Sequence, residues 1–226
     1  MFRRVVLWGT AMSIVVGGAL PLAVQADTIN PPLPDTPEAT APLKRAISIS
    51  QPRDFSSADR KKIVALAKKA GALAYPGRAI TLGLVKVHRV DATTTKESVV
   101  QKVLRGYQVP MSTTVQDIEV VRNLMSLQAA DALQANTIVM GRSSAIIRGA
   151  RIGDIVTLLD IRNKRHEFVI GNIAEDNLVG EADLLLSPRQ ADVLGAKLIT
   201  RYTIIGFTNA AALESALRNA GFRDGN

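Results

Sequence analysis

The sequence predicts an α+β fold, a single compact layered domain with a mixed sheet, a β-hairpin and about five helices. Segments with helical and strand periodicity follow one another over short connections, which is typical of one layered domain. Hydrophobic residues make up 47% of the chain and aromatic residues 4%, so we expect an aliphatic interior. The chain contains no cysteine, and packing alone must therefore hold the fold together.

The N-terminal segment, residues 1–26, has the order of a secretory signal. Arg3 and Arg4 precede an apolar run over 5–22, and Val24-Gln25-Ala26 offers the side chains that a signal peptidase accepts. We predict cleavage after Ala26. The alternative is an uncleaved anchor, since the run is near the minimum length for spanning a bilayer. In both cases we expect the remainder to lie outside the cytoplasm, secreted or associated with the cell envelope.

Residues 27–43 are predicted to form an extended linker ahead of a globular domain over 44–226. Proline fixes φ and removes a backbone donor, so repeated prolines favour a semi-rigid tether. The prolines of this segment are Pro31, Pro32, Pro34, Pro37 and Pro42.

The domain is predicted to begin with a helix and a strand. Ser56 or Ser57 can cap a helix that runs to Ala70 and ends at Gly71. Residues 78–90 have strand character, and their apolar parity changes between Leu84 and Val85. This change predicts a β-bulge or burial on both faces of the strand.

Two further helices are predicted next. Thr94 or Thr95 can cap the first, which ends at Gly106 and carries the apolar residues Val99, Val100, Val103 and Leu104. Thr114 with Asp117 can open the second, which runs to about Ala135 and which Ser126 can bend.

The second half of the domain is richer in strand patterns. Short strands are predicted over 137–140, 182–186 and 201–205, and residues 154–161 and 166–173 are predicted to pair as a hairpin around 162–165. Ser187-Pro188 predicts the start of a helix that Gly195 ends. Thr208 or Asn209 can cap a closing helix that reaches Gly221.

The residue inventory predicts no enzyme, no metal and no cofactor. His88 and His166 are isolated histidines on predicted strands, which we expect at edges or on the surface, and a zinc site needs three or four converging ligands. Ser143 lacks the second glycine of a nucleophile elbow and is predicted to cap a helix. The acidic residues Glu175, Asp176, Glu181 and Asp183 are expected to be solvated loop charges.

Charge is the feature that most suggests a partner. The formal net charge is +8, and removal of Arg3 and Arg4 with the signal lowers it to +6. An exported cationic domain is attracted to polyanions, which in an envelope are anionic wall polymers or lipid headgroups rather than nucleic acid. The candidate binding residues are Lys61, Lys62, Lys68 and Lys69 on the first helix, and Arg162, Lys164 and Arg165 at the hairpin tip. A solvated charged face is the alternative for both groups.

Three segments resemble a known module when taken together. They are Arg105-Gly-Tyr-Gln-Val-Pro-Met-Ser112, the run from Met140 through Arg151-Ile-Gly-Asp154 to Leu158, and the run from Val179 to Gly195. They resemble the N-terminal non-catalytic module of actinobacterial exported VanY-type D-alanyl-D-alanine carboxypeptidases. At the level of the fold, their order is also similar to the periplasmic core domain of MacB-type transporter permeases. The zinc-binding motif of the VanY-type peptidase domain is absent from this chain, so the resemblance implies a module whose partner performs the chemistry.

The sequence therefore favours an exported, non-enzymatic binding or scaffold module of the cell envelope, linked to peptidoglycan metabolism. Its expected partners are anionic envelope polymers or a peptidoglycan-processing enzyme, and contact with a membrane is expected only through residues 5–24 if the signal is uncleaved. One alternative is a hydrolase in which Ser143, His166 and Asp176 converge. Another is an accessory periplasmic domain of a MacB-type transporter.

Overall fold

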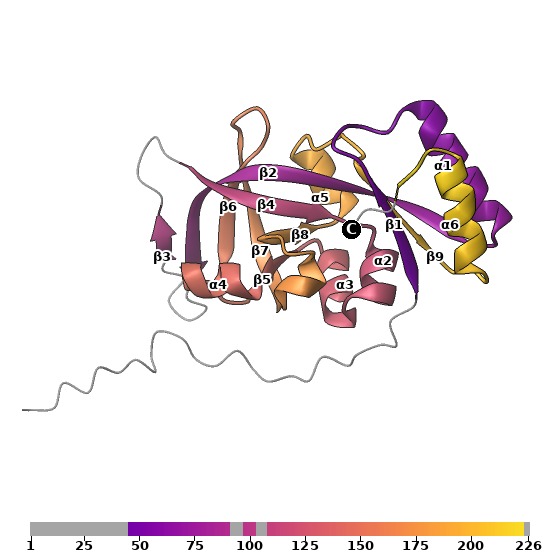
Figure 1. Ribbon diagram of the computed structural model, residues 1–226. Coiled ribbons are helices and arrows are strands. Elements are labelled where there is room, and N and C mark those ends of the chain that lie inside the picture. Colours follow the sequence, from indigo (N-terminus) through magenta and orange to yellow (C-terminus); the bar gives the residue numbers. More distant parts are fainter. Residues whose placement is uncertain (1–44, 91–96, 103–107, 224–226) are drawn as a thin grey trace, which may run out of the picture. The chain divides into compact units, whose positions relative to one another are not determined.

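The computed structural model of the chain (Figure 1) describes residues 45–90, 97–102 and 108–223. The predicted signal segment over 1–26 and the Pro-rich linker over 27–43 lie outside these residues. Among the helices of the described ranges, none combines the length and the apolar character needed to cross a bilayer.

Strands and helices alternate along the described chain. The strands are β1 (Ala46–Ser50), β2 (Leu73–Val90), β3 (Glu97–Lys102), β4 (Val109–Val115), β5 (Ile138–Gly141), β6 (Ile155–Leu159), β7 (Arg165–Ala174), β8 (Leu184–Leu186) and β9 (Arg201–Ile205). The helices are α1 (Ser57–Lys69), α2 (Ile118–Leu124), α3 (Leu127–Gln134), α4 (Arg142–Arg148), α5 (Pro188–Val193) and α6 (Ala210–Asn219), with a 3₁₀ turn, η2 (Asp176–Val179). The mixture confirms the predicted α+β class.

Strand β2 closes a ring of strands because both of its edges are paired. Along the ring, β2 is followed by β4, β8, β5, β7 and β6, and β6 pairs with β2 again. The β4–β8 and β5–β7 pairs are parallel and the others antiparallel. The register of β2 against β6 shifts between Leu84 and Lys86, which confirms the bulge predicted from the change of parity. A bulge increases the local twist that a closing sheet needs.

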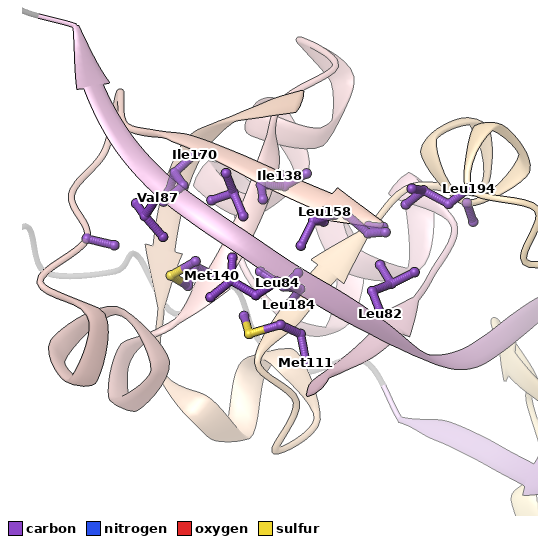
Figure 2. Close-up of a cluster of buried hydrophobic side chains, with 14 of the residues drawn as sticks. Leu82, Leu84, Val87, Met111, Ile138, Met140, Leu158, Ile170, Leu184 and Leu194 are labelled. Carbon is purple, nitrogen blue, oxygen red and sulfur yellow. The ribbon is translucent and has the colours of Figure 1, made fainter. Parts of the chain in front are cut away.

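The interior of the ring is a continuous aliphatic core. Figure 2 shows these buried side chains gathered between the strands. Its members come from every strand of the ring: Leu82, Leu84, Val87, Met111, Val115, Ile138, Met140, Val156, Leu158, Ile170, Leu184 and Leu186. No aromatic side chain is fully buried among them, in agreement with the expectation of an aliphatic interior.

Helices α2 and α3 cover the outside of β5 and β8. Alternate residues of these strands face opposite sides of a sheet, so Ile138 and Met140 fill the ring while Val139 and Leu185 pack with the helices. All residues of β5 and β8 are buried in consequence. Residues 182–186 are almost all apolar because both faces of this strand are covered, one by the ring interior and the other by the helices.

A second core lies where the first and last elements of the domain meet. Strand β9 pairs with β1 on one edge and with residues 73–77 of β2 on the other. Helices α1 and α6 contribute Ile63, Ala67, Leu213 and Leu217 to this core. Phe55 and Tyr202 meet there edge to face, with ring centroids 5.4 Å apart.

Most predicted element ends are confirmed by cap geometry. Ser56 caps α1 by accepting from the amide of Asp59, and Asn209 caps α6 by accepting from the amide of Ala212. Ser187 forms a capping box with Gln190 at the start of α5. The predicted hairpin is confirmed as β6 and β7.

The helix predicted from Thr94 or Thr95 to Gly106 is wrong for residues 97–102, the part of it that the structure describes. Residues 97–102 form β3, which pairs with β2 from Lys86 to Val90. Strand β4 pairs with β2 only as far as Leu84. The same edge of β2 beyond Leu84 therefore has free backbone groups, and residues 97–102 pair with them. The β-branched Val99 and Val100 also favour a strand. Thr94, Thr95, Val103, Leu104 and Gly106 lie outside the described residues.

The single helix predicted over 114–135 is also corrected. Thr114 lies in β4, and the helix begins after Asp117, whose carboxylate accepts from the amide of Glu119. Ser126 does more than bend the helix, because its hydroxyl caps a separate α3 by accepting from the amide of Ala129. Strand β1 was not predicted, although its alternation of Ile47 and Ile49 with serines is a strand signal.

Candidate functional site

The two histidines occupy different environments, and one differs from the prediction. His88 is buried, at 2% exposure, where it was expected at an edge or on the surface. It lies where β2 is paired on both edges, by β3 and by β6, so neither edge is open to solvent. His166 is half-buried on β7. The part of the chain that the structure describes contains no group of three His, Asp or Glu side chains arranged to hold a metal ion.

The hydrolase arrangement of Ser143, His166 and Asp176 is not formed. The carboxylate of Asp176 accepts hydrogen bonds from the amide and the hydroxyl of Ser143. His166 is hydrogen-bonded to Asp160, and the nine residues of β7 from His166 to Ala174 span about 26 Å. Ser143 is therefore not the predicted N-cap. Gly141 occupies that position without a capping side chain, and Asp176 supplies the missing acceptor from η2.

Asp183 is not the solvated loop charge that was expected. Its carboxylate accepts from the amide and hydroxyl of Ser112 at 2.8 and 2.9 Å, and from the hydroxyl of Ser144 at 2.7 Å. The guanidinium of Arg148, of which 7% of the side chain is exposed, lies 3.5 Å away. Burial alone would raise the pKa of Asp183, but these hydrogen bonds and the charge of Arg148 lower it below its ordinary value. This polar network ties α4 to β4 and β8.

The lysines of α1 are exposed as predicted, but one of them has a structural contact. Lys62 donates to the carbonyl of Ala220 at 3.1 Å and lies over the ring of Phe222. Lys68 and Lys69 lie in the last turn of α1, where positive charge favours the helix dipole. Lys61, Lys68 and Lys69 form no ion pair with other described residues.

The basic residues of the hairpin tip lie on a turn that is closed by hydrogen bonds to Asp160. The Oδ1 atom of Asp160 accepts from the amides of Arg162 and Lys164, at 2.7 and 2.8 Å. Its Oδ2 atom lies 3.0 Å from Nε2 of His166. Asn163 takes the left-handed conformation, with a φ of 60°, that closes such a turn. Arg162, Lys164 and Arg165 are exposed, and none of them has an acidic partner among the described residues.

The hairpin tip also rests on the end of α5. The amide of Ile161 lies 3.5 Å from the carbonyl of Leu194, and a Cβ atom at Gly195 would lie 2.8 Å from Cγ1 of Ile161. Gly195 has a φ of 76°, so glycine satisfies both the backbone and the close approach. Figure 1 shows the hairpin loop beside α5.

This contact adds residues that the sequence analysis missed. Lys197 is exposed two positions after Gly195, and Ile161, Val193 and Leu198 are exposed by 62%, 54% and 59%. We call Arg162, Lys164, Arg165, Lys197 and these three aliphatic residues the hairpin-tip surface. The pairing of β6 with β7 predicted the tip, but no pattern within either segment indicates that 161 and 193–198 meet.

The turn gives a first testable prediction. In Asp160→Ala the amides of Arg162 and Lys164 lose their acceptor, so we expect these two amides to exchange with solvent about tenfold faster. Hydrogen exchange followed by NMR measures this, with the buried amides of β5 as the internal control. Unchanged exchange at the tip would contradict the assigned role of Asp160.

The pH dependence of the turn has a defined sign. Burial alone would raise the pKa of Asp160, but the hydrogen bonds from Lys164, His166 and Arg162 and the charge of His166 lower it below the ordinary value of 3.8. The ionised carboxylate therefore stabilises the folded state above pH 3.8, and this contribution is lost as the pH falls through the lowered pKa.

Comparison with known proteins gives structural neighbours at low sequence identity. No protein-family model matches the sequence, and no curated protein matches it. The chain is similar to a domain assigned to a permease protein from Porphyromonas gingivalis, with 16% identity, a TM-score of 0.39, and coverage of 66% of this chain and 68% of that one. It is also similar to the extracellular domain of the noncanonic ABC-type transporter YknZ from Gram-positive bacteria, with 8% identity, a TM-score of 0.44, and coverage of 80% and 97%.

Both neighbours are domains of permease or transporter proteins, the class named by the predicted likeness to MacB-type permeases, and neither of the two is a VanY-type module. Identities and TM-scores this low place the chain in no family.

Proposed function

We propose that this chain is a non-enzymatic binding module of the cell envelope that attaches to an anionic envelope component through the hairpin-tip surface. The observation that carries the proposal is the set of Arg162, Lys164, Arg165 and Lys197, which are exposed on and beside a braced turn. None of the four forms an ion pair with an acidic side chain among the described residues. Asp160 is occupied by the turn itself, and Asp192 is bound to Arg78.

Two further features support the proposal. The N-terminal residues have the order of an export signal, which would bring the domain to the anionic surfaces of an envelope. The side chains that could have formed a hydrolase are used to cap a helix and to brace a turn. A link to peptidoglycan metabolism, with a peptidoglycan-processing enzyme as partner, is the finer part of the proposal and has its support in the sequence resemblance. An accessory role in a transporter stays the alternative.

Charge removal at the tip tests the proposal. For a variant with Arg162, Lys164 and Arg165 all replaced by glutamine, we expect binding to isolated envelopes, wall and membrane together, to weaken at least tenfold at low salt. Each basic residue near an anionic surface contributes about 1 kcal/mol, and salt screens the attraction. Co-sedimentation at low and high ionic strength measures the effect.

The matched control removes the same number of charges from α1, with Lys61, Lys68 and Lys69 replaced by glutamine. Lys62 is left in place because of its contact with Ala220. We expect this variant to bind within about threefold of the native chain, since net charge alone acts weakly at long range. Equal loss in both variants would show that net charge, rather than the hairpin tip, attracts the domain.

A further inference from the structure

The hairpin-tip surface combines exposed aliphatic side chains with its cations. Ile161 lies against the end of α5, Val193 directly precedes Leu194, and Leu198 follows Gly195 by three residues. Single exposed aliphatic residues are common on soluble proteins, but here three of them lie at, or within three residues of, one contact. Each of the three residues is more than half exposed.

The basic residues beside these side chains form no ion pair with an acid among the described residues. Arg162 directly follows Ile161, and Lys197 directly precedes Leu198. The acids closest in sequence are turned to other partners: Asp160 accepts from the turn amides, and Asp192 pairs with Arg78, which also donates to the carbonyl of Ala196. The surface that remains is aliphatic in part and cationic around it.

We infer that the hairpin-tip surface binds the interface of an anionic lipid bilayer. The inference rests on the proposed function and names the anionic component that the tip contacts. A hydrated wall polymer would pair with the cations but would leave Ile161, Val193 and Leu198 in water. A bilayer interface satisfies both, because phosphate headgroups meet the basic residues while aliphatic side chains enter the boundary with the acyl chains.

The geometry of the tip suits such a contact. Shallow insertion works best with a rigid projection, since ordering a mobile loop would cost conformational entropy. Asp160 braces the turn from within, and the close approach of Ile161 to Gly195 holds the turn on α5. The turn that carries Ile161, Arg162 and Lys164 is therefore held in place by contacts within the fold.

Vesicle binding by the full chain tests the inference. The probes are vesicles of phosphatidylcholine alone and of phosphatidylcholine with phosphatidylglycerol, together with purified sacculi free of lipid. We expect the native chain to prefer the anionic vesicles. Ile161→Ser and Leu198→Ser should each weaken that binding about fivefold, because each removes an aliphatic side chain that the bilayer would partly bury. Both positions are exposed, so melting curves should confirm that the variants fold like the native chain.

A local probe separates the tip from the N-terminal apolar run, which every variant retains. The chain has no cysteine, so a polarity-sensitive dye can be attached at Val193→Cys, with Ala65→Cys on the exposed face of α1 as the control. We expect a blue shift on anionic vesicles at position 193 and none at position 65. An unshifted dye at 193, or native vesicle affinity in both serine variants, would overturn the inference.

The outcomes distinguish this inference from the proposed function. If sacculi bind through Arg162, Lys164 and Arg165 while anionic vesicles do not, the proposed function stands and the lipid inference fails. If the triple glutamine variant binds vesicles, sacculi and whole envelopes like the native chain, both fail.

Discussion

Replacement of Asp183 by alanine is expected to lower the free energy of unfolding by about 3 to 5 kcal/mol. The variant leaves the guanidinium of Arg148 without its carboxylate partner, and this is costly because only 7% of the Arg148 side chain is exposed. Burial already lowers the pKa of Arg148, with the charge of Asp183 acting in the opposite direction, so removal of the carboxylate leaves the burial uncompensated. Urea denaturation of the native and variant chains measures the difference.

A double-mutant cycle isolates the ion pair from the rest of the network. In Arg148→Met the buried charge is absent, so we expect Asp183→Ala to cost less in that background than in the native chain. The remaining loss belongs to the hydrogen bonds from Ser112 and Ser144. Equal costs in the two backgrounds would show that Arg148 does not depend on Asp183.

The same carboxylate sets the sign of a pH effect. Folding lowers the pKa of Asp183 below its ordinary value of 3.8. The carboxylate therefore stabilises the native chain fully at a pH above 3.8, and this stability is lost as the pH falls through the lowered pKa. The Asp183→Ala variant should show a shallower loss of stability over this range.

Gly171→Ala is expected to destabilise the chain by at least about 2 kcal/mol. A Cβ atom at position 171 would lie 2.6 Å from Cβ of Thr137 and 3.0 Å from Cβ of Ala132. Thr137 cannot easily move, because its hydroxyl donates to the carbonyl of Ala132 and its carbonyl accepts from the side chain of Gln190. The midpoint of thermal unfolding measures the effect.

Gly83→Ala is the matched control within the same ring. A Cβ atom there would meet the side chain of Gln108, with Cδ at 2.9 Å, but that side chain is exposed and can rotate away. We expect a loss below about 1 kcal/mol. Similar losses in both variants would show that the approach of β7 to Thr137 is not the cause.

Local signals in the sequence predicted much of the fold. Helix ends at Ser56, Ser187 and Asn209 were predictable because a capping hydroxyl or amide acts within three residues of its own position. The bulge in β2 was predictable because burial alternates along a strand, and a break in the alternation must appear in the sequence. The hairpin was predictable because its strands are adjacent in the chain.

The features that were missed depend on segments far apart in the chain. Residues 97–102 were predicted as part of a helix, and the open edge of β2, a distant segment, is the main reason for their extended form. Asp183 is a loop residue in the sequence, and its partners Ser112 and Arg148 come from two other elements. The candidate binding surface shows both cases, since Arg162, Lys164 and Arg165 were predicted from one loop while Val193, Lys197 and Leu198 join them through a contact with α5.

Strand β2 has a consequence for how the domain can come apart. Its first five residues pair with β9, and its remaining residues pair with β4, β6 and β3 on one uninterrupted backbone. Because this one strand contributes to both cores, we expect the two cores to unfold together in one cooperative transition, and a force applied to β2 in one core should be transmitted along its backbone to the other.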